Sequence, residues 1–520
     1  MTKTPLRDLV VVLPGIMGSV LEGPGGTALW DPGYGMARRL FGHRKWVREL
    51  TITGLDDPGD TSHLNGVRPV SLVESKAIVP GIKRIGGYSE LHQALDNTFD
   101  LVEGDQHDPA RRRGNVPPNY FRFAYDWRRD NRASAMQLKE LIDVALPAWR
   151  QYRSDPNAKV ILVAHSMGGM VARWYLEGVD PNTNDRLEGW RNVRDLYTFG
   201  TPYRGSLNAL QYCVEGFKVS FVDFSEALRG FTSVHQLLPR FPAILDKRSG
   251  SGQWIRPSEA RHVGSLDAAK AEEARSGFHE VIDGGVLAHR DTDGYDDRMV
   301  SPIIGFGHDT DNSAVLTTGG LELRAEPAVN TPAAWQRGDG TVPYVSAVPL
   351  DYDGLDSGWD KAAPLEFVNK KHGTMQTDAD VLARIIANKV LATQVDGGAV
   401  RALPDEGPVE LATRLAGGPQ MGLNLPDTVP AGTPVPVTVR LAGVDPDEVE
   451  VTVTDLGSGA AVGSETLVPD PDGTVTFALA PGDYEVRAAR KAYVPGIGLL
   501  HSSDLVAVIP EEDQQGANDD

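Results

Sequence analysis

The sequence predicts an α/β domain followed by a smaller all-β domain, on the evidence of three features. Residues 9–13 and 160–163 are short, wholly apolar segments rich in valine and isoleucine, which is typical of parallel strands buried on both faces. A helical pattern begins shortly after the second segment, at Gly169. From residue 421 the pattern changes to short alternating strands separated by turns. A chain of 520 residues is long enough for two such domains.

Ser166 lies between the second apolar segment and this helix, in the sequence Ala-His-Ser-Met-Gly. A strand–turn–helix with small residues two before and two after a serine is the nucleophile elbow of α/β-hydrolases, because larger side chains would collide in so tight a turn. Here those residues are Ala164 and Gly168. The elbow would lift the hydroxyl above the sheet, at the positive end of a helix. An ordinary serine in a strand-to-helix loop is the alternative.

A serine nucleophile requires a base and an orienting acid, which follow in the order Ser, Asp or Glu, His in this fold. The most conspicuous acidic candidate is Asp339, which two glycines flank. Only His372 and His501 follow it, and His501 lies in the all-β region, which leaves His372. The interval before Asp339 can hold two strands and a cap, and the interval after it can hold one strand. A turn aspartate and a surface histidine are the alternatives, but the required order favours a triad of Ser166, Asp339 and His372.

The oxyanion hole of this fold uses the N–H after the nucleophile and a second N–H from the loop after an early strand. Met167 follows the serine, and the glycine-rich residues 14–19 follow the first strand. Glycines allow main-chain donors to approach a bound carbonyl without steric cost. We therefore expect the N–H groups of Met17 and Met167 to bind the oxyanion. A plain turn at residues 14–19 is the alternative.

Seven short blocks occur in an order that resembles the lecithin:cholesterol acyltransferase family, which includes phospholipid:diacylglycerol acyltransferases and bacterial lipase-like members. The blocks are PGIMGS from Pro14, LWDP from Leu29, YDWR from Tyr125, HSMGG from His165, FGTP from Phe199, GDGTVP from Gly338 and KHG from Lys371. The resemblance spans residues 8–395. It implies an α/β-hydrolase that forms an acyl-enzyme from a lipid ester, with Ser166, Asp339 and His372 as triad and Met17 and Met167 as oxyanion donors. It leaves the acyl acceptor open.

Residues 205–331 are expected to form a cap above the sheet, because they are dense in aromatic and aliphatic side chains. The segment Ser-Val-His-Gln-Leu-Leu-Pro within them is similar to the cap of the family. A lid or acyl-chain tunnel that excludes water is one interpretation, and a small core of the cap itself is the other. The candidate substrate contacts are Trp30, Phe217, Phe221, Leu237 and Leu238. For Trp30, anchoring of its own loop is the alternative.

Composition narrows the function classes further. The net charge of −20 argues against nucleic acid and against electrostatic adsorption to anionic membranes. The chain has no apolar run of the ~20 residues that a membrane-spanning helix needs. The single cysteine, Cys213, cannot form an internal disulfide, and the N-terminal residues lead directly into the first strand, so a cytoplasmic location is expected. No cofactor is expected because serine chemistry needs none, and no metal, since residues 291–297 lack the order of an EF-hand loop.

The expected domains are an α/β-hydrolase catalytic domain over residues 1–400, a linker over 401–420, an immunoglobulin-like β-sandwich over 421–510 and an acidic disordered tail over 511–520. Strands are expected at 434–441, 448–455, 474–479, 483–489 and 504–509. Modules of this kind mostly bind another molecule or act as spacers between domains. A protein partner is therefore expected for the sandwich.

The expected function is that of a serine-dependent lipid-ester hydrolase or O-acyltransferase, acting on phospholipid or acylglycerol esters at a membrane surface. The two activities differ only in whether water or an alcohol releases the acyl group, and no residue decides between them. A non-catalytic binding or effector scaffold, with the sandwich as its working part, is the alternative from another class. An intact triad argues against that alternative.

Overall fold

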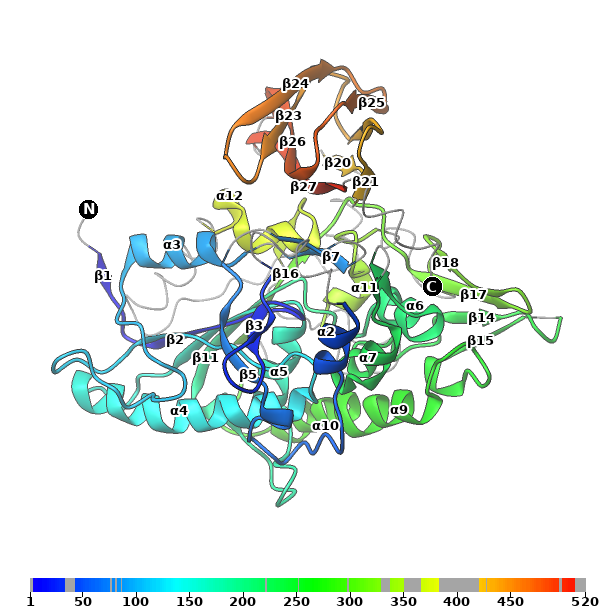
Figure 1. The fold of residues 1–520 in the computed structure, drawn as a ribbon. Coiled ribbons are helices and arrows are strands. Elements are labelled where there is room, and N and C mark those ends of the chain that lie inside the picture. Colours follow the sequence, from blue (N-terminus) through cyan, green and yellow to red (C-terminus); the bar gives the residue numbers. More distant parts are fainter. Residues whose placement is uncertain are drawn as a thin grey trace.

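A central parallel sheet organises the larger part of the molecule (Figure 1). Of the 520 residues, the computed structural model describes 3–32, 43–74, 77–79, 82–85, 87–219, 222–250, 252–296, 299–328, 337–349, 366–382, 420–426, 428–494 and 498–509. The sheet has six strands in the order β19-β16-β11-β10-β2-β9, and every neighbouring pair is parallel. These strands are β2 (Leu9–Leu13), β9 (Tyr120–Arg122), β10 (Val160–His165), β11 (Val193–Phe199), β16 (Val300–Gly305) and β19 (Glu366–Val368).

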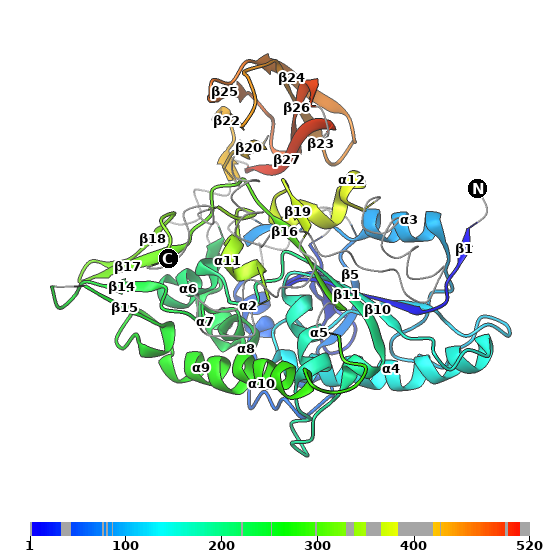
Figure 2. The ribbon, with the colours of Figure 1, turned by 180° about the vertical axis from the view of Figure 1, so that it is seen from behind.

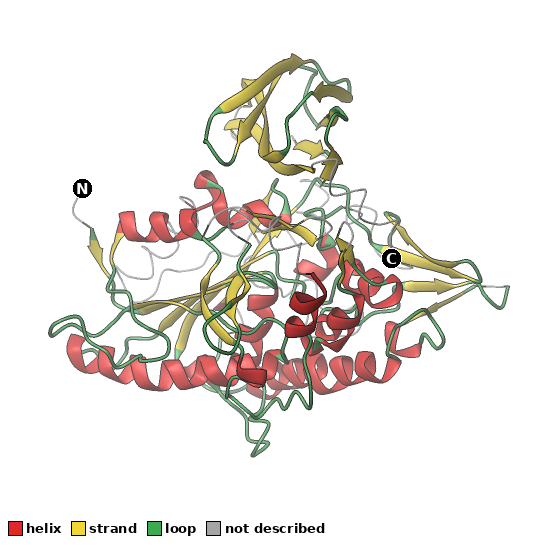
Figure 3. Cartoon of the chain, viewed as in Figure 1, coloured by secondary structure: helices red, strands yellow, loops and turns green. Residues whose placement is uncertain are grey.

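Helices cover both faces of this sheet, as Figure 3 shows. Alternate residues of a strand point to opposite faces. Leu9, Val11 and Leu13 of β2 accordingly join one core cluster with α4 (Asn131–Arg153) and α5 (Met167–Glu177). Val10 and Val12 join a second cluster with α3 (Ser89–Thr98). This burial on both faces explains the continuous apolar run in the sequence, and the mixed architecture with a central parallel sheet fits an α/β-hydrolase.

An insertion of short elements follows β11 and lies beside the sheet, at the right of Figure 1. Its elements, which we call the cap, are α6 (Leu207–Glu215), β12 (Lys218–Val219), β13 (Val222–Asp223), α7 (Ser225–Gly230), α8 (Thr232–Gln236), β14 (Ile244–Asp246), β15 (Gln253–Ile255), η4 (Pro257–Glu259), α9 (Ala268–Glu273), η5 (Ala274–His279), α10 (Glu280–His289), β17 (Ser313–Thr317) and β18 (Gly320–Arg324). Four of its strands form a separate sheet in the order β15-β14-β17-β18.

The expected cap range of 205–331 needs one correction, because β16 lies inside it and belongs to the central sheet. All six residues of β16 are buried, and Pro302 pairs with Thr198 of β11. Proline is unusual in a central strand because it cannot donate a ladder hydrogen bond. This residue is a physical reason why the segment does not resemble a strand in the sequence.

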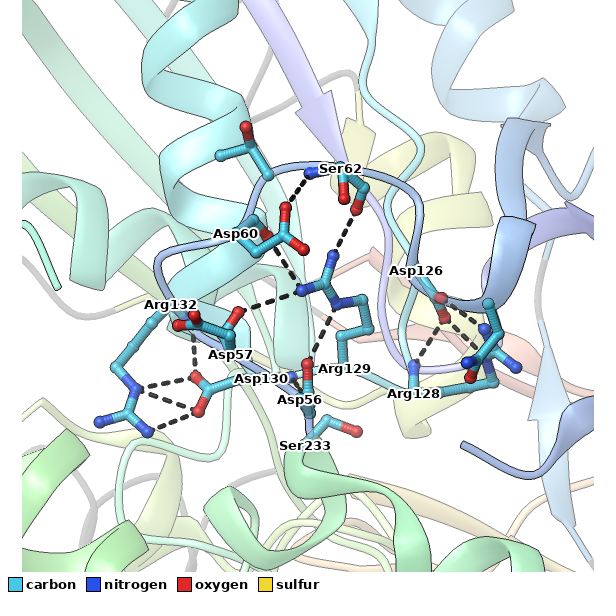
Figure 4. Close-up of polar contacts among 12 residues, drawn as sticks. Asp56, Asp57, Asp60, Ser62, Asp126, Arg128, Arg129, Asp130, Arg132 and Ser233 are labelled. Atoms are coloured by element: carbon cyan, nitrogen blue, oxygen red, sulfur yellow. Dashed lines mark hydrogen bonds and ion pairs between the residues drawn. The ribbon is translucent and has the colours of Figure 1, made fainter. Parts of the chain in front are cut away.

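A network of arginines and aspartates follows β9 and joins three parts of the chain (Figure 4). Arg128, which has no exposed side-chain surface, forms a two-bond ion pair with Asp126 over 2.8 and 2.6 Å. Arg129 bonds Asp56 at 3.1 Å and donates to the carbonyl oxygens of residues 57, 60 and 62. The network thereby holds the segment of residues 56–62 against the start of α4.

The same network fastens the cap to α4. Asp130 caps the helix by accepting from the N–H of Arg132, and its carboxylate also accepts from Gln236 of α8 at 2.8 Å. The Asn131 N–H donates to the Gln236 side chain at 2.9 Å, and the Ser233 hydroxyl donates to the carbonyl of Trp127 at 2.7 Å. The part of the cap around α8 is therefore held to the start of α4, and so to the central sheet, by buried hydrogen bonds.

Residues 420–509, which we call the C-terminal β region, form two sheets, and Figure 2 shows them above β19 and α12 (Ala379–Leu382). One sheet is antiparallel in the order β20-β22-β25, and the other has the order β21-β27-β26-β23-β24 with one parallel pair, β21 and β27. The strands are β20 (Gln420–Asn424), β21 (Thr428–Pro430), β22 (Val435–Ala442), β23 (Val449–Asp455), β24 (Ala461–Leu467), β25 (Asp472–Phe477), β26 (Gly482–Val494) and β27 (Gly498–Ile509).

Residues from both of these sheets share one core cluster. The five expected strands correspond to β22, β23, β25, β26 and β27, whereas β20, β21 and β24 are additional. An immunoglobulin-like topology remains a prediction. Residues 401–419 of the expected linker and the whole expected tail lie outside the described residues.

The remaining elements complete the larger part. They are β1 (Thr4–Pro5), β3 (Ser19–Glu22), β4 (Ala28–Trp30), α2 (His43–Leu50), η2 (Leu64–Gly66), β5 (Arg68–Leu72), β6 (Ala77–Val79), β7 (Ile82–Ile85), β8 (Phe99–Asp100), η3 (Gly189–Arg191), α11 (Tyr344–Ala347) and η9 (His372–Thr377). Over the residues that the structure describes, no helix combines the length and the apolar character needed to cross a membrane.

Candidate active site

Ser166 forms a sharp turn between β10 and α5. Its backbone has φ 52° and ψ −124°, a left-handed φ that is uncommon for a residue other than glycine. Two hydrogen bonds hold this turn: the Ser166 N–H donates to the carbonyl of Phe199 at 2.8 Å, and the Thr201 hydroxyl donates to the carbonyl of Ser166 at 2.9 Å. Strained backbone of this kind persists only where its surroundings fix it. The turn therefore has the geometry expected of an elbow.

Glycines make room for this turn at two close approaches. A Cβ on Gly168 would lie 2.4 Å from the carbonyl oxygen of Pro14, which belongs to backbone and cannot rotate away. A Cβ on Gly15 would lie 2.9 Å from the Cβ of Ser166. The loop after β2 thus packs directly against the serine and the first turn of α5.

His372 lies between Ser166 and Asp339, which are far away in the sequence. Its Nε2 lies 2.9 Å from the Ser166 Oγ, and its Nδ1 lies 2.7 Å from the Asp339 Oδ2. A carboxylate only accepts, so Nδ1 carries the proton and Nε2 is free to accept from the serine hydroxyl. The structure therefore brings together the three residues that the sequence analysis selected.

Asp339 is almost fully buried and its carboxylate is held from two sides. Its Oδ1 accepts from the N–H groups of Thr341 and Val342 at 2.9 and 2.7 Å, while Oδ2 faces the imidazole. The N–H of His372 also donates to the carbonyl of Asp339 at 2.9 Å. At Gly200, where φ is 57°, a Cβ would lie 2.8 Å from the carboxylate. This packing leaves the carboxylate a single orientation toward the histidine.

The residue before the serine, His165, takes part in a second set of buried contacts. Its Nδ1 lies 2.9 Å from the hydroxyl of Tyr88, and its Nε2 lies 3.0 Å from the carbonyl oxygen of His372. The Tyr88 oxygen also accepts from the N–H of Gly15 at 2.8 Å. Burial, together with the nearby His372, lowers the pKa of His165 to about 3. Its ring is therefore neutral at physiological pH.

The two expected oxyanion donors come from two segments that meet at the serine, α5 and the loop after β2. Met167 begins α5, and the first N–H groups of a helix have no acceptor within the helix. Met17 lies in the loop after β2 with φ 63°, and it lines the same cavity as the serine. The Trp30 indole N–H donates to the carbonyl of Met17 at 2.9 Å, which fixes this part of the loop.

A cavity of about 450 Å³ opens over the serine and the histidine. Loops of the central sheet, the cap and the C-terminal β region all contribute to its lining, which includes Ile16, Leu228, Val234, Leu237, Leu423 and Leu425. More of the lining surface is apolar than polar. Such a site suits a ligand with one polar reacting group and an apolar body.

Of the five expected substrate contacts, Leu237 is placed in this lining, whereas Trp30, Phe217 and Leu238 are not among its residues. Trp30 is 1% exposed and packs in the core against Trp46 and Trp127, with ring centroids 6.2 and 5.2 Å away. It supports its own loop, which is the alternative interpretation. Phe217 packs against Tyr212 and Phe224 in the core of the cap, and Leu238 is buried in the same cluster. Phe221 lies outside the described residues.

Sequence reasoning missed several residues at the site. His165 belongs to the serine motif, but its spacing gives no indication of the bond to His372. Tyr88 carries no local signal at all. No sequence pattern indicates that the C-terminal β region contributes to the cavity lining, because this contribution depends on how two distant parts of the chain pack. Within the described ranges, no group of three or more His, Cys, Asp or Glu side chains is arranged to hold a metal ion.

Residues 112–255 match the family model of lecithin:cholesterol acyltransferase. The predicted resemblance to this family is confirmed. The matched residues contain Ser166 and the first half of the cap, whereas Asp339 and His372 lie beyond them. The sequence has no match among curated proteins.

Two solved structures give weaker likenesses. Phospholipase PlaB from Legionella pneumophila is 11% identical, with 81% of this chain and 88% of that chain covered and a TM-score of 0.31. The sulfur carrier protein SoxY from Chlorobium limicola f thiosulfatophilum is 20% identical, with 17% of this chain and 77% of that chain covered and a TM-score of 0.13. Neither TM-score is high enough to decide the fold.

Proposed function

We propose that this protein is a serine-dependent lipid-ester hydrolase or O-acyltransferase that forms an acyl-enzyme on Ser166. The proposal rests above all on one observation, the hydrogen-bonded series Asp339–His372–Ser166 at the floor of a largely apolar cavity. The similarity of residues 112–255 to lecithin:cholesterol acyltransferase supports the choice of a lipid ester as substrate.

In the proposed acylation step, the Ser166 oxygen attacks the ester carbonyl while His372 Nε2 takes the hydroxyl proton. Asp339 keeps the imidazole in the required tautomer and stabilises the imidazolium that forms. The N–H groups of Met17 and Met167 bind the developing oxyanion. Collapse of the tetrahedral intermediate breaks the ester bond, and the imidazolium gives its proton to the leaving alcohol.

In the proposed deacylation step, water or an alcohol attacks the acyl-enzyme with His372 as base. Water yields a free fatty acid and an alcohol yields a new ester, and the same residues serve both reactions. An apolar cavity that excludes water would favour the ester product. The choice between them is therefore a matter of what reaches the acyl-enzyme first.

The proposal extends to the organisation of the chain. Residues 1–400 form the catalytic unit with its cap, residues 421–510 form an immunoglobulin-like sandwich, and residues 401–420 link the two. Two packed sheets with one common core support the sandwich. A cytoplasmic location stays part of the proposal on the basis of the single cysteine, Cys213, which is buried and free.

The first test is covalent labelling with a fluorophosphonate, which reacts only with an activated serine. We expect the wild-type protein to be labelled on Ser166, and the Ser166→Ala variant to lose labelling and about 10⁶-fold in turnover. A folded wild-type protein that takes no label would contradict the proposal and favour the non-catalytic scaffold.

The second test separates the two acceptors. The protein is incubated with phospholipid vesicles and a radiolabelled long-chain alcohol, and the products are resolved by chromatography. A labelled ester that requires Ser166 identifies an O-acyltransferase. Free fatty acid alone, at every alcohol concentration, identifies a hydrolase.

A further inference from the structure

We infer that the C-terminal β region is part of the active site, where it forms one wall of the substrate cavity and positions the loop that carries His372. This inference rests on the proposed function, because it assigns a role within the same site. It replaces the expectation that the region only binds a partner or acts as a spacer.

One wall of the cavity comes from β20 and the loop that follows it. Gly422, Leu423, Asn424, Leu425 and Pro426 are five consecutive lining residues. Leu423 and Leu425 are anchored in the core of the C-terminal β region, so their positions are fixed by its packing. Asn424 is exposed at the cavity, so a larger side chain there can be accommodated without disturbing the core. These residues are placed to contact the part of a substrate that extends away from the reacting carbonyl.

The loop before the histidine is joined to the same region at three successive residues. The Asn369 side chain accepts from the N–H of Met421 at 3.0 Å. Lys370 donates to the ring of His501 at 2.9 Å. Lys371 forms an ion pair with Asp504 of β27. The residue after these three contacts is His372.

The ion pair between Lys371 and Asp504 is largely buried. Asp504 has no exposed surface and Lys371 is mostly buried. Removing one partner of a buried pair leaves an uncompensated charge, which is strongly unfavourable, so such a contact does not open and close freely. Lys370 is held in addition by Asp378 at 2.6 Å. Arg440 of β22 also pairs with Asp309 at 3.3 Å, but this pair is exposed and adds little. The contacts at residues 369–371 therefore hold the wall against the histidine loop.

The two roles affect different substrates, so kinetics can separate them. A wall residue affects how well a long acyl chain fits but leaves the reaction of a short ester unchanged. A positioning residue affects the reaction of every ester, because a small displacement of a catalytic group lowers the rate steeply. Both are measured with a series of p-nitrophenyl esters from acetate to palmitate.

For the wall, the test variant is Asn424→Phe and its control is Val462→Phe, at an exposed position of β24 away from the cavity. We expect Asn424→Phe to lower kcat/KM for palmitate about tenfold relative to acetate, because the ring fills part of the cavity. The control should keep the wild-type ratio. If Asn424→Phe has the same dependence of kcat/KM on acyl-chain length as the wild type, the proposal that these residues form a wall of the substrate cavity is wrong.

For the positioning, the test variant is Asp504→Asn and the conservative control is Lys371→Arg. We expect Asp504→Asn to lower kcat for acetate about tenfold with little change in KM, since His372 loses its fixed place. Lys371→Arg retains a cation opposite Asp504, so as the conservative variant it should show a kcat higher than that of Asp504→Asn. The kinetics are measured well below the Tm of the variant. A folded Asp504→Asn variant with the wild-type kcat would overturn the positioning role.

These outcomes are distinct from failure of the proposed function. If the wild-type protein takes no fluorophosphonate label, the proposed function itself is wrong. If the wild type is labelled but neither variant differs from its control, only the inference is wrong. If Asp504→Asn does not fold, the positioning role is tested with Lys371→Gln, which removes the same ion pair from its less buried side, and a wild-type kcat in that variant would overturn it.

Discussion

His165 donates a hydrogen bond from its Nε2 to the carbonyl oxygen of His372, over 3.0 Å. A carbonyl can only accept, so this bond fixes the proton on Nε2 and makes Nδ1 an acceptor. Nδ1 must then receive the hydroxyl proton of Tyr88, whose oxygen accepts in turn from the N–H of Gly15. One set of aligned hydrogen bonds thus connects the loop after β2, the serine strand and the histidine loop.

The Tyr88→Phe substitution tests this connection. It leaves the Gly15 N–H and the His165 Nδ1 without their buried partner, so we expect a loss of about 1–3 kcal/mol in the free energy of unfolding. We also expect kcat to fall about tenfold with little change in KM, because the loop after β2 and the histidine loop lose their common support. Urea unfolding and steady-state kinetics measure the two effects. Tyr152→Phe, at a half-exposed position of α4, is the control, and equal kcat in both variants would contradict the prediction.

The Asp339→Asn substitution tests the orienting role of the carboxylate. The amide oxygen can still accept from the N–H groups of Thr341 and Val342, so the fold should persist. The amide NH₂ would face the Nδ1 of His372, which then has to accept and leaves Nε2 protonated. A base with its proton on the wrong nitrogen cannot activate the serine, and we expect kcat to fall about 10⁴-fold. Asp96→Asn at the surface is the control, and a loss of less than about tenfold in Asp339→Asn would count against the assignment.

The Gly168→Ala substitution tests the close approach beneath the elbow. Its Cβ would lie 2.4 Å from the carbonyl oxygen of Pro14, so the backbone must shift. We expect a loss of about 1–3 kcal/mol in stability, which is typical of overpacking, together with a large loss of fluorophosphonate labelling. Gly230→Ala is the matched control, because a Cβ there meets nothing within 4 Å. Labelling of both variants at the wild-type rate would show that the elbow tolerates a larger residue.

Buried histidines, His165 and His279 among them, make the stability of the protein sensitive to acid. Burial lowers the pKa of both His165 and His279 to about 3, from an ordinary value of 6.5. Below pH 6.5 the unfolded chain binds protons that the folded chain does not, so the stabilising effect is complete above pH 6.5 and is lost as the pH falls toward 3. Each histidine should contribute a slope of about 1.4 kcal/mol per pH unit in this window.

The His279→Gln variant isolates one of these two contributions. His279 lies outside the proposed site, where its Nε2 bonds the carbonyl of Gln236 at 2.9 Å. Urea unfolding between pH 6.5 and 5 should show a slope smaller than that of the wild type by about 1 kcal/mol per pH unit, since an unfolded histidine is half protonated at pH 6.5 and almost fully protonated at pH 5. Parallel stability curves for the two proteins would contradict the lowered pKa.

Much of the part built around the central sheet could be predicted because its signals in the sequence are local. The strands β2 and β10 are continuous apolar runs, and the turn at Ser166 has its small flanking residues within five positions. The chain order of known triads then reduced the search for partners to Asp339 and His372. In the structure His372 lies within hydrogen-bonding distance of both Asp339 and Ser166. Their catalytic roles remain proposals.

What escaped prediction depends on contacts between distant segments. Tyr88 lies far from His165 in the sequence, and no local pattern indicates that their side chains meet. An apolar side chain such as Trp30 or Phe217 can equally well line a cavity or fill a core, and its burial is settled only by the packing around it. The wall formed by the C-terminal β region is likewise a product of long-range packing.

The hydrogen bond between His372 and Ser166 joins residues that are 206 positions apart in the chain. Contacts of such long separation form late, since the entropy of closing so large a loop must first be overcome. During synthesis the serine leaves the ribosome well before the imidazole that would activate it. A growing polypeptide of this sequence therefore lacks the hydrogen-bonded series Asp339–His372–Ser166 until the later segments have emerged and folded.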